Sequence, residues 1–242
     1  MSYTALNNPN VRRRQYVEAI TWYLQSTDFP ILFVENSGTD ISTEFTPYIE
    51  NGRLEVITYD GNNYDRSLGK GYGEAQIMKY GFGHSRILQQ DDALVIKITG
   101  RFICKNINEI VRKYHSKNTV YANISKDDWG GNIASSGFVI APYRFWNEYF
   151  LPRREELNDS KRFHFEHLLY ESVCKCTKDG MRHREFWKIP QMEGVSGTSG
   201  QLSISSNKRD FKSKLLFFLH RLAYRGYLNP FYKGDPGFVI NG

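Results

Sequence analysis

The chain has 242 residues, of which 40% are hydrophobic and 15% aromatic, and it carries a formal net charge of +6. A chain of this length can bury a substantial core, and α/β domains often reach this size, so we expect one domain. No apolar run approaches the length of a membrane span, and the first residues lack the apolar core of a signal peptide. We therefore expect a cytoplasmic protein.

The positive charge indicates an anionic partner, which could be nucleic acid, a membrane surface or a phosphorylated small molecule. No helix-turn-helix, RNP-type strand or zinc-finger spacing is present in the sequence, so a dedicated nucleic-acid-binding protein is not favoured. The cysteines are Cys104, Cys174 and Cys176. Their odd number and the absence of a CxxC pair support neither a disulfide framework nor a zinc site, and we expect reduced thiols.

Strand and helix patterns alternate through the first half of the chain. Periodicity and apolar runs predict a helix, two strands, a helix and a strand over residues 11–27, 29–38, 53–63, 73–88 and 91–102, respectively. Strands separated by helices imply a largely parallel sheet with helices on both faces. The ligand of such a sheet lies beyond the carboxyl ends of the strands, where this chain has the loops ENSGTD, YDGNN and TGRF.

The second half of the chain has a more mixed pattern. Strands are predicted over residues 118–124 and 134–146, flanking a glycine-rich turn, and a helix over residues 163–176. A glycine- and serine-rich loop at 193–202 and a basic, apolar helix at 208–228 follow. The sequence thus predicts one α/β domain with a C-terminal helical appendage.

The stretch KGYGEAQ could hold an anion, because Lys70, Gly71, Gly73 and Glu74 stand where a helix begins. Backbone N–H groups and the positive end of a helix dipole favour negative charge at such a point. The stretch lacks the Walker lysine spacing and the full dinucleotide fingerprint, so an ordinary loop before a helix is the alternative.

The stretch KITGR ends a buried strand with two cations. Strand alternation puts Lys97, Thr99 and Arg101 on one face, and Gly100 allows a close approach of the backbone. The arginine could grip a diphosphate with a bidentate fork and the lysine as a point charge. The alternative is that one of these cations pairs with a neighbouring carboxylate.

The stretch HFEHLLYE places a carboxylate between two histidines. On a helix Glu166 and His167 point in different directions, so the segment does not match the HExxH zinc motif. We expect a single carboxylate, Glu166, to act as a general base, with Glu171, His164 and His167 as further candidates. A solvated helix face is the alternative.

The order of these segments resembles a group of bacterial GT-A-type glycosyltransferases of surface polysaccharide synthesis, over most of the chain. The matching segments are NNPN, QYVEAITWYLQSTDFPILFVENSG, YDGNN, KGYGEAQ, DDALVIKITGRF and FEHLLYE. The most specific is KGYGEAQ followed by KITGRF, because in related enzymes a glycine-containing loop and a helix precede the strand that ends in a metal-binding DxD.

This resemblance implies a GT-A-like, Rossmann-like fold with a mostly parallel sheet, in which residues 1–105 bind the nucleotide sugar and residues 106–242 supply the acceptor side and the C-terminal helix. It implies transfer of a sugar from a nucleotide-diphosphate donor, first of all a UDP-sugar, to a saccharide or lipid-linked acceptor in capsule or O-antigen synthesis. The residues that it assigns to the donor are Asn8, Asn10, Glu35, Asn36, Ser37 and Asp60, with Lys70, Gly71, Gly73, Glu74, Thr99 and Gly100 of the two stretches above. An ordinary turn is the alternative for ENSG.

The chain departs from the resembled pattern at the metal. Asp91 and Asp92 stand at the beginning of the strand, and no DxD follows it, so no metal ligand is assigned and a need for Mn²⁺ or Mg²⁺ is left open. Lys97 and Arg101 would then stabilise the leaving diphosphate in place of a metal. If a metal is required, Asp127 and Asp128 are the first carboxylates to test.

Three further expectations concern the acceptor side. Glu166 would accept the proton of the acceptor hydroxyl, with His164 and His167 beside it. A flap that contains Gly194, Ser196, Gly197 and Thr198 would close over a substrate, unless this segment is an exposed linker. The helix at 208–228 would contact the anionic inner face of the membrane, unless its apolar stripe packs on the sheet.

A second functional class stays open beside the transferase. The same basic groups would serve a non-catalytic protein that binds phosphate or nucleic acid. If the chain is a transferase, we expect no nucleic-acid partner.

Overall fold

The computed structural model describes residues 8–88, 93–186, 188–195 and 202–204. The chain divides into two units, residues 1–203 and 204–242, and all but one of the described residues belong to the first unit. The predicted flap residues Ser196, Gly197 and Thr198, and the predicted helix at 208–228 with its membrane contact, lie outside the described residues.

The first part of the chain forms a parallel strand pair between helices. Its elements are α1 (Pro9–Ser26), β1 (Ile31–Glu35), η1 (Ser42–Phe45), α2 (Thr46–Glu50), β2 (Leu54–Thr58), η2 (Arg66–Leu68) and α3 (Lys70–His84). The register of the β1–β2 pair runs from Ile31 opposite Leu54 to Glu35 opposite Thr58.

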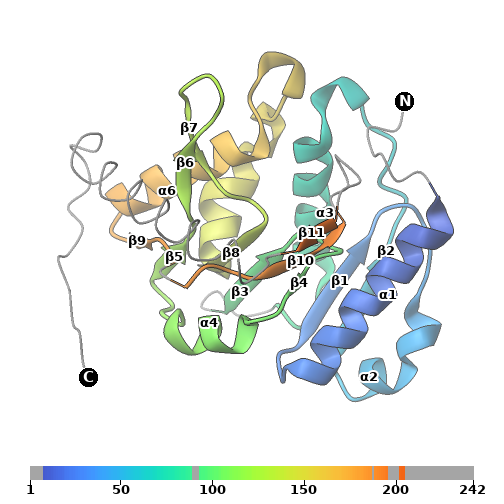
Figure 1. The fold of residues 1–242 in the computed structure, drawn as a ribbon. Helices are drawn as coiled ribbons and strands as arrows, with labels where there is room; N and C mark the ends of the chain where they lie inside the picture. The colour runs from blue at the N-terminus through green and yellow to red at the C-terminus, as the bar shows by residue number, and fades with distance from the viewer. Residues whose placement is uncertain (1–7, 89–92, 187, 196–201, 205–242) are drawn as a thin grey trace, which may run out of the picture. The chain divides into compact units, whose positions relative to one another are not determined.

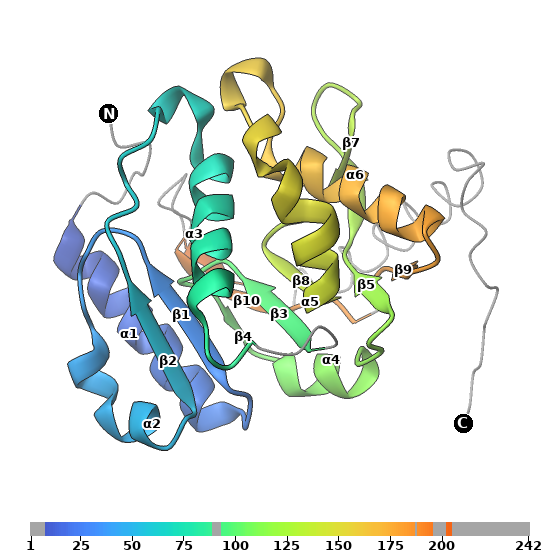
Figure 2. The same ribbon diagram turned by 180° about the vertical axis from the view of Figure 1, so that it is seen from behind.

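Strand alternation explains how β1 is covered on both faces. Ile31 and Phe33 pack against the cluster that contains Ile20 of α1. Val34 points the other way and approaches Gly81 of α3, where a Cβ atom would collide with it. Glycine lowers the stability of a helix interior, but at Gly81 it is needed for the packing of α3 on β1. The helices α1 and α3 thus lie on opposite faces of β1–β2 (Figures 1 and 2).

The second part of the chain contains a mixed sheet with helices. Its elements are β3 (Leu94–Ile98), β4 (Ile103–Cys104), α4 (Ile107–Lys113), β5 (Thr119–Tyr121), β6 (Ile124–Lys126), β7 (Asn132–Ala134), β8 (Phe138–Pro142), α5 (Tyr143–Phe145), η3 (Trp146–Phe150), η4 (Leu151–Glu156), η5 (Asp159–Lys161), α6 (Phe165–Lys178), β9 (Arg182–Arg184), β10 (Met192–Val195) and β11 (Leu202–Ile204). The strand order of the main sheet is β3-β8-β5-β9. In this sheet β8 is antiparallel to both β3 and β5, whereas β9 is parallel to β5.

The largest core cluster joins β8 to the helical segments that follow it. Phe145, Trp146 and Phe150 are fully buried there and pack with Leu168 and Leu169 of α6. Burial of such large side chains is the main favourable term for this part of the fold, at about 1.5–3 kcal/mol per residue. It holds α6 firmly in place, and α6 carries the candidate base.

The fold is mixed α/β, as the alternation of elements predicted. The sheets, however, are smaller and more mixed than the mostly parallel sheet that we expected. The predicted strand over residues 134–146 is also only partly formed, because β8 ends at Pro142 and the chain then turns into helix to bury Phe145 and Trp146. Among the described residues, no helix is long and apolar enough to cross a membrane.

Candidate functional site

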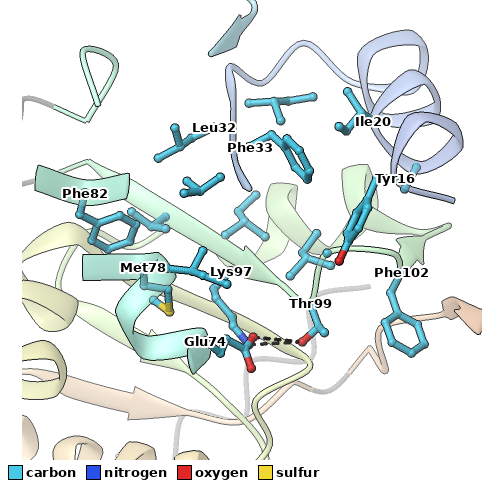
Figure 3. Close-up of a pocket in the computed structure, with 18 of the residues that line it drawn as sticks. Tyr16, Ile20, Leu32, Phe33, Glu74, Met78, Phe82, Lys97, Thr99 and Phe102 are labelled. Carbon is cyan, nitrogen blue, oxygen red and sulfur yellow. Dashed lines mark hydrogen bonds and ion pairs between the residues drawn. The ribbon is translucent and has the colours of Figure 1, made fainter. Parts of the chain in front are cut away.

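A cavity of about 940 Å³ lies between the β1–β2 pair and the main sheet, β3-β8-β5-β9 (Figure 3). Within the described ranges, β1 pairs only with β2 and β3 pairs only with β8, so one edge of each strand is left for the cavity. Residues of both strands line it, as do residues of α1 and α3. Side chains such as Leu32, Phe33 and Met78 make much of this lining apolar.

The cavity has a polar end at the carboxyl ends of β1 and β3. Its polar or glycine residues come from the first turns of α1 and α3, from β3 and from the segments that follow β1, β2 and β3. They are Arg12, Asn36, Asn62, Tyr64, Arg66, Gly69, Lys70, Gly73, Glu74, Lys97, Thr99 and Gly100. Seven of the residues expected to contact the donor or its diphosphate therefore meet in one place: Asn36, Lys70, Gly73, Glu74, Lys97, Thr99 and Gly100.

Lys97 is buried, and its charge is matched by a carboxylate. Its Nζ lies 2.6 Å from Oε1 of Glu74 and donates to the carbonyl oxygen of Ser136 at 2.5 Å and to Oγ1 of Thr99 at 3.3 Å. The ring of Phe165 lies 4.8 Å from the same atom. These contacts supply the partners that a buried cation needs, so Lys97 and Glu74 together add little net charge to the cavity.

Glu166 is connected to this pair through one residue. Its Oε1 accepts a hydrogen bond of 2.5 Å from the hydroxyl of Ser136, the residue whose carbonyl oxygen accepts from Lys97. Glu166 stands in the first turn of α6 and is half-buried. The positive end of the helix favours a carboxylate at this position.

Two imidazole–carboxylate pairs surround the start of α6. His164 Nδ1 lies 2.9 Å from Asp159 Oδ1, and His167 Nε2 lies 2.9 Å from Asp127 Oδ2. Nδ1 of His167 accepts from the N–H of His164 at 3.2 Å, so in the neutral ring the proton is on Nε2 and is donated to Asp127. Burial alone would raise the pKa of Asp127, but hydrogen bonds from His167, Gly131 and Trp129 outweigh it and lower the pKa.

Arg101 is separated from Lys97, contrary to the expectation that both grip one diphosphate. The N–H of Phe102 donates to the carbonyl oxygen of Thr99, and this turn ends the alternation of β3. Arg101 consequently points to α1, where Nη1 donates to Oε1 of Gln15 at 3.1 Å and the guanidinium lies 5.9 Å from the ring of Tyr16.

Several residues assigned to the donor make hydrogen bonds that hold the local fold. The side chain of Asn8 caps α1 by accepting from the N–H groups of Asn10 and Val11. Oε2 of Glu35 accepts from the N–H groups of Ser37 and Thr39, which makes ENSG a self-contained turn.

Asp60 and Gly71 likewise serve the fold. Asp60 is bridged to Ser37 through the backbone and is exposed. A Cβ atom on Gly71 would lie 3.0 Å from Phe165, so this glycine allows α3 to approach α6.

Some residues at the site were not predicted from the sequence. Asn62 was not singled out in the sequence, although it belongs to the loop YDGNN that was expected near the ligand. Its Oδ1 accepts a hydrogen bond from Nδ2 of Asn36 at 3.1 Å. Arg12 lines the cavity from α1, and its buried Nε has no hydrogen-bond partner among the described residues. No sequence pattern indicates Ser136, because its contacts arise only in the folded chain: β8 pairs with β3, which carries Lys97, and the preceding strand β7 packs against α6, which carries Glu166.

The described residues contain no group of three or more His, Cys, Asp or Glu side chains that could hold a metal ion. The carboxylate of Asp127 contacts His167 and accepts hydrogen bonds from the N–H groups of Trp129 and Gly131 in its own turn. Gly194, the first predicted flap residue, packs closely on the backbone of Arg101, and its φ of 157° together with this contact excludes a larger residue. Gly194 thus lies beside the tip of KITGR, and that the segment after it acts as a flap stays a prediction.

The largely apolar cavity thus has a polar, partly cationic end, and hydrogen bonds through Ser136 link this end to the carboxylate of Glu166. Such an arrangement can bind an anionic ligand and deprotonate a hydroxyl group beside it. No protein-family model matches the chain, and no curated protein matches it.

Proposed function

We propose that the chain is a nucleotide-sugar-dependent glycosyltransferase with a GT-A-like fold. The observation that carries the proposal is the cavity between the carboxyl ends of β1 and β3, whose polar end is linked through Lys97 and Ser136 to Glu166. In α/β proteins a ligand often binds beyond the carboxyl ends of the strands. The residues that follow β1 and β3, Asn36, Thr99 and Gly100, line the cavity at this end.

In this proposal the nucleotide diphosphate occupies the polar end of the cavity. Breaking the bond from the sugar to the diphosphate builds negative charge on the leaving group, which cations stabilise. Glu74 balances Lys97, so we assign this stabilisation first to Arg12, whose buried Nε has no hydrogen-bond partner among the described residues. Arg66 and Lys70 line the same end and add positive charge to it. Lys97 then orients Ser136, and Arg101 holds α1 against the tip of β3.

Glu166 is the proposed base in this reaction. It accepts the proton of the acceptor hydroxyl as that oxygen attacks the anomeric carbon. The hydrogen bond from Ser136 fixes one of its carboxylate oxygens and leaves the other for the acceptor. The acceptor is a saccharide or a lipid-linked saccharide, and a role in surface polysaccharide synthesis follows from the resemblance alone.

The test is a screen of nucleotide sugars for hydrolysis and transfer, run with EDTA and with Mn²⁺. We expect activity with one donor that survives EDTA, and stabilisation against heat by the free nucleoside diphosphate but not by an oligonucleotide. Stabilisation by the oligonucleotide alone would instead support the non-catalytic, nucleic-acid-binding class. Activity that EDTA abolishes and Mn²⁺ restores would show that cations do not replace a metal.

A matched pair of variants locates the diphosphate. Arg12→Gln removes a cavity cation with a buried, unpartnered Nε, so it should weaken nucleotide binding by about tenfold or more. Arg14→Gln, two residues along α1, changes the net charge equally at an exposed position outside the cavity lining. Equal losses in both variants would mean that binding follows overall charge.

A further inference from the structure

Trp129 stands out on the surface of the protein. It is the exposed large hydrophobic side chain among the described residues, with 62% of its surface accessible. It lies in the turn between β6 and β7, next to Gly130, whose φ of 85° the turn requires. A single exposed apolar residue is ordinary on a protein surface, so the surroundings of Trp129 decide whether it has a role.

The turn that carries Trp129 is fixed to α6 at two points. Oδ1 of Asp127 accepts from the N–H groups of Trp129 and Gly131 at 3.0 and 2.7 Å, while its Oδ2 contacts His167 at 2.9 Å. Nδ2 of Asn132 donates to the hydroxyl of Tyr170 on the same helix at 3.2 Å. Figures 1 and 2 both show the β6–β7 hairpin standing beside α6. The backbone that carries the indole is therefore held in place, although the indole itself faces solvent.

Two polar side chains lie beside the indole. The guanidinium of Arg162 is 5.0 Å from the Trp129 ring, and the ring of His164 is 6.5 Å away at an interplanar angle of 29°. Arg162 has a φ of 59°, the left-handed conformation that non-glycine residues seldom adopt, and it is the one such residue in the described ranges. The guanidinium thus lies over part of the indole and the imidazole stacks near it, while 62% of the Trp129 surface stays accessible beside these hydrogen-bond donors.

The position of this surface relative to the cavity indicates which substrate it would bind. Neither Trp129 nor Arg162 lines the cavity. His164 caps the helix turn that contains Glu166, and Glu166 is linked to the cavity through Ser136 and Lys97. Glu166 is thus linked by hydrogen bonds to the cavity, and it stands two residues after the N-cap His164, whose ring lies 6.5 Å from the indole. A ligand on the indole would therefore lie near the helix start that carries the candidate base.

We propose that Trp129, Arg162 and His164 form a platform that binds a sugar ring of the acceptor saccharide. The C–H face of a pyranose stacks on the indole, which offers a rigid apolar surface, and Arg162 and His164 donate hydrogen bonds to the hydroxyls. That the bound saccharide is the acceptor rests on the proposed function, whereas the platform itself requires only that a saccharide binds.

The experiment measures saccharide binding without any nucleotide sugar. A panel of mono- to tetrasaccharides of hexoses, N-acetylhexosamines, hexuronic acids and deoxyhexoses is titrated by calorimetry and by NMR saturation transfer. We expect at least one member to bind, Trp129→Ala to weaken its binding by about tenfold or more, and Trp129→Tyr to restore part of the affinity. Trp22→Phe, on α1, is the matched control and should bind as the wild type does.

Arg162→Gly separates binding from folding. It relieves the backbone conformation and removes the guanidinium, so we expect a higher melting temperature together with weaker saccharide binding. No binding by the wild type to any member, or unchanged binding by Trp129→Ala, would overturn the proposal. A loss of nucleotide binding in Trp129→Ala would also overturn it, because the indole would then contact the nucleobase of the donor. Saccharide binding that depends on Trp129, in a protein that turns over no nucleotide sugar, would overturn the proposed function and leave the platform intact.

Discussion

The carboxylates on α6 differ in what surrounds them, and this difference decides which one can act on a substrate. Glu166 accepts from Ser136, which connects it to the cavity. Oε2 of Glu171, which is exposed on α6, lies 2.7 Å from Nη2 of Arg153 in η4. A second carboxylate, that of Glu156, contacts the same guanidinium. An ion pair of this kind stabilises the surface and leaves Glu171 no route to the cavity.

We predict that Glu166→Gln lowers sugar transfer by a factor on the order of 10² to 10⁴, the usual contribution of a general base. Glutamine keeps the shape of the side chain and can still accept from Ser136, so donor binding and the melting temperature should stay unchanged. Glu171→Gln is the matched control and should transfer at the normal rate. Normal transfer by Glu166→Gln would move the base to His164 or His167.

Among the elements, those with a strong local pattern were predictable from the sequence. The helical spacing of Tyr16, Ala19, Ile20 and Tyr23 corresponds to α1, and the apolar runs correspond to β1, β2, β3 and β8. The short strands β6 and β7 and the helix α4 were not predicted, since their stability comes from contacts with distant residues. The pattern of one segment cannot indicate what lies opposite it.

The site shows the same division at finer detail. Alternation along β3 correctly put Lys97 and Thr99 on one face, because both lie within or next to the regular strand. It failed for Arg101, which follows the turn between Thr99 and Phe102. The partner of Lys97, Glu74, is far away in sequence, so only its location at the start of a helix could be predicted.

One contact between elements gives a pH-dependent test of the fold. Glu55 of β2 is buried and accepts from the hydroxyl of Ser85 at 2.6 Å and from the N–H groups of Arg86 and Ile87 at 3.0 and 3.4 Å, where α3 ends. Burial alone would raise the pKa of Glu55, but these hydrogen bonds outweigh it and lower the pKa. The carboxylate therefore ties the end of α3 to β2.

We predict that Glu55→Gln lowers the free energy of unfolding at pH 7 by about 1–3 kcal/mol, the value for hydrogen bonds to a buried charged group. A carboxyl with a pKa that is lower in the folded state contributes stability above its unfolded pKa and loses it as the pH falls through the folded pKa. The difference between wild type and variant should thus shrink below about pH 4. Urea unfolding at several pH values measures it, with exposed Glu50→Gln as control. A difference that stays constant with pH would contradict the assignment.

At the scale of the described molecule, the main feature is that the β1–β2 pair and the main sheet, β3-β8-β5-β9, face each other across a cavity and do not join into one sheet. The edges of β1 and β3 that face it carry no strand partner within the described ranges, whereas β8 is paired on both sides. Unpaired edges of apolar strands are costly, and a ligand or water must satisfy their N–H and C=O groups. The cavity is consequently where ligand binding should change the stability of both sheets together.

We predict that amide hydrogen exchange is faster in β1 and β3 than in β8, and that a bound nucleoside diphosphate slows it at the ends of β1 and β3 at the same time. The reason is geometric: Asn36 follows one strand, Thr99 and Gly100 follow the other, and all three line the polar end of the cavity. A ligand that contacts both loops couples the local opening of the two sheets, so each becomes harder to open. Inorganic phosphate, too small to contact both loops, is the control and should protect less. Protection confined to one strand would show that the ligand binds a single loop, and the cavity between the sheets would then not be the donor site.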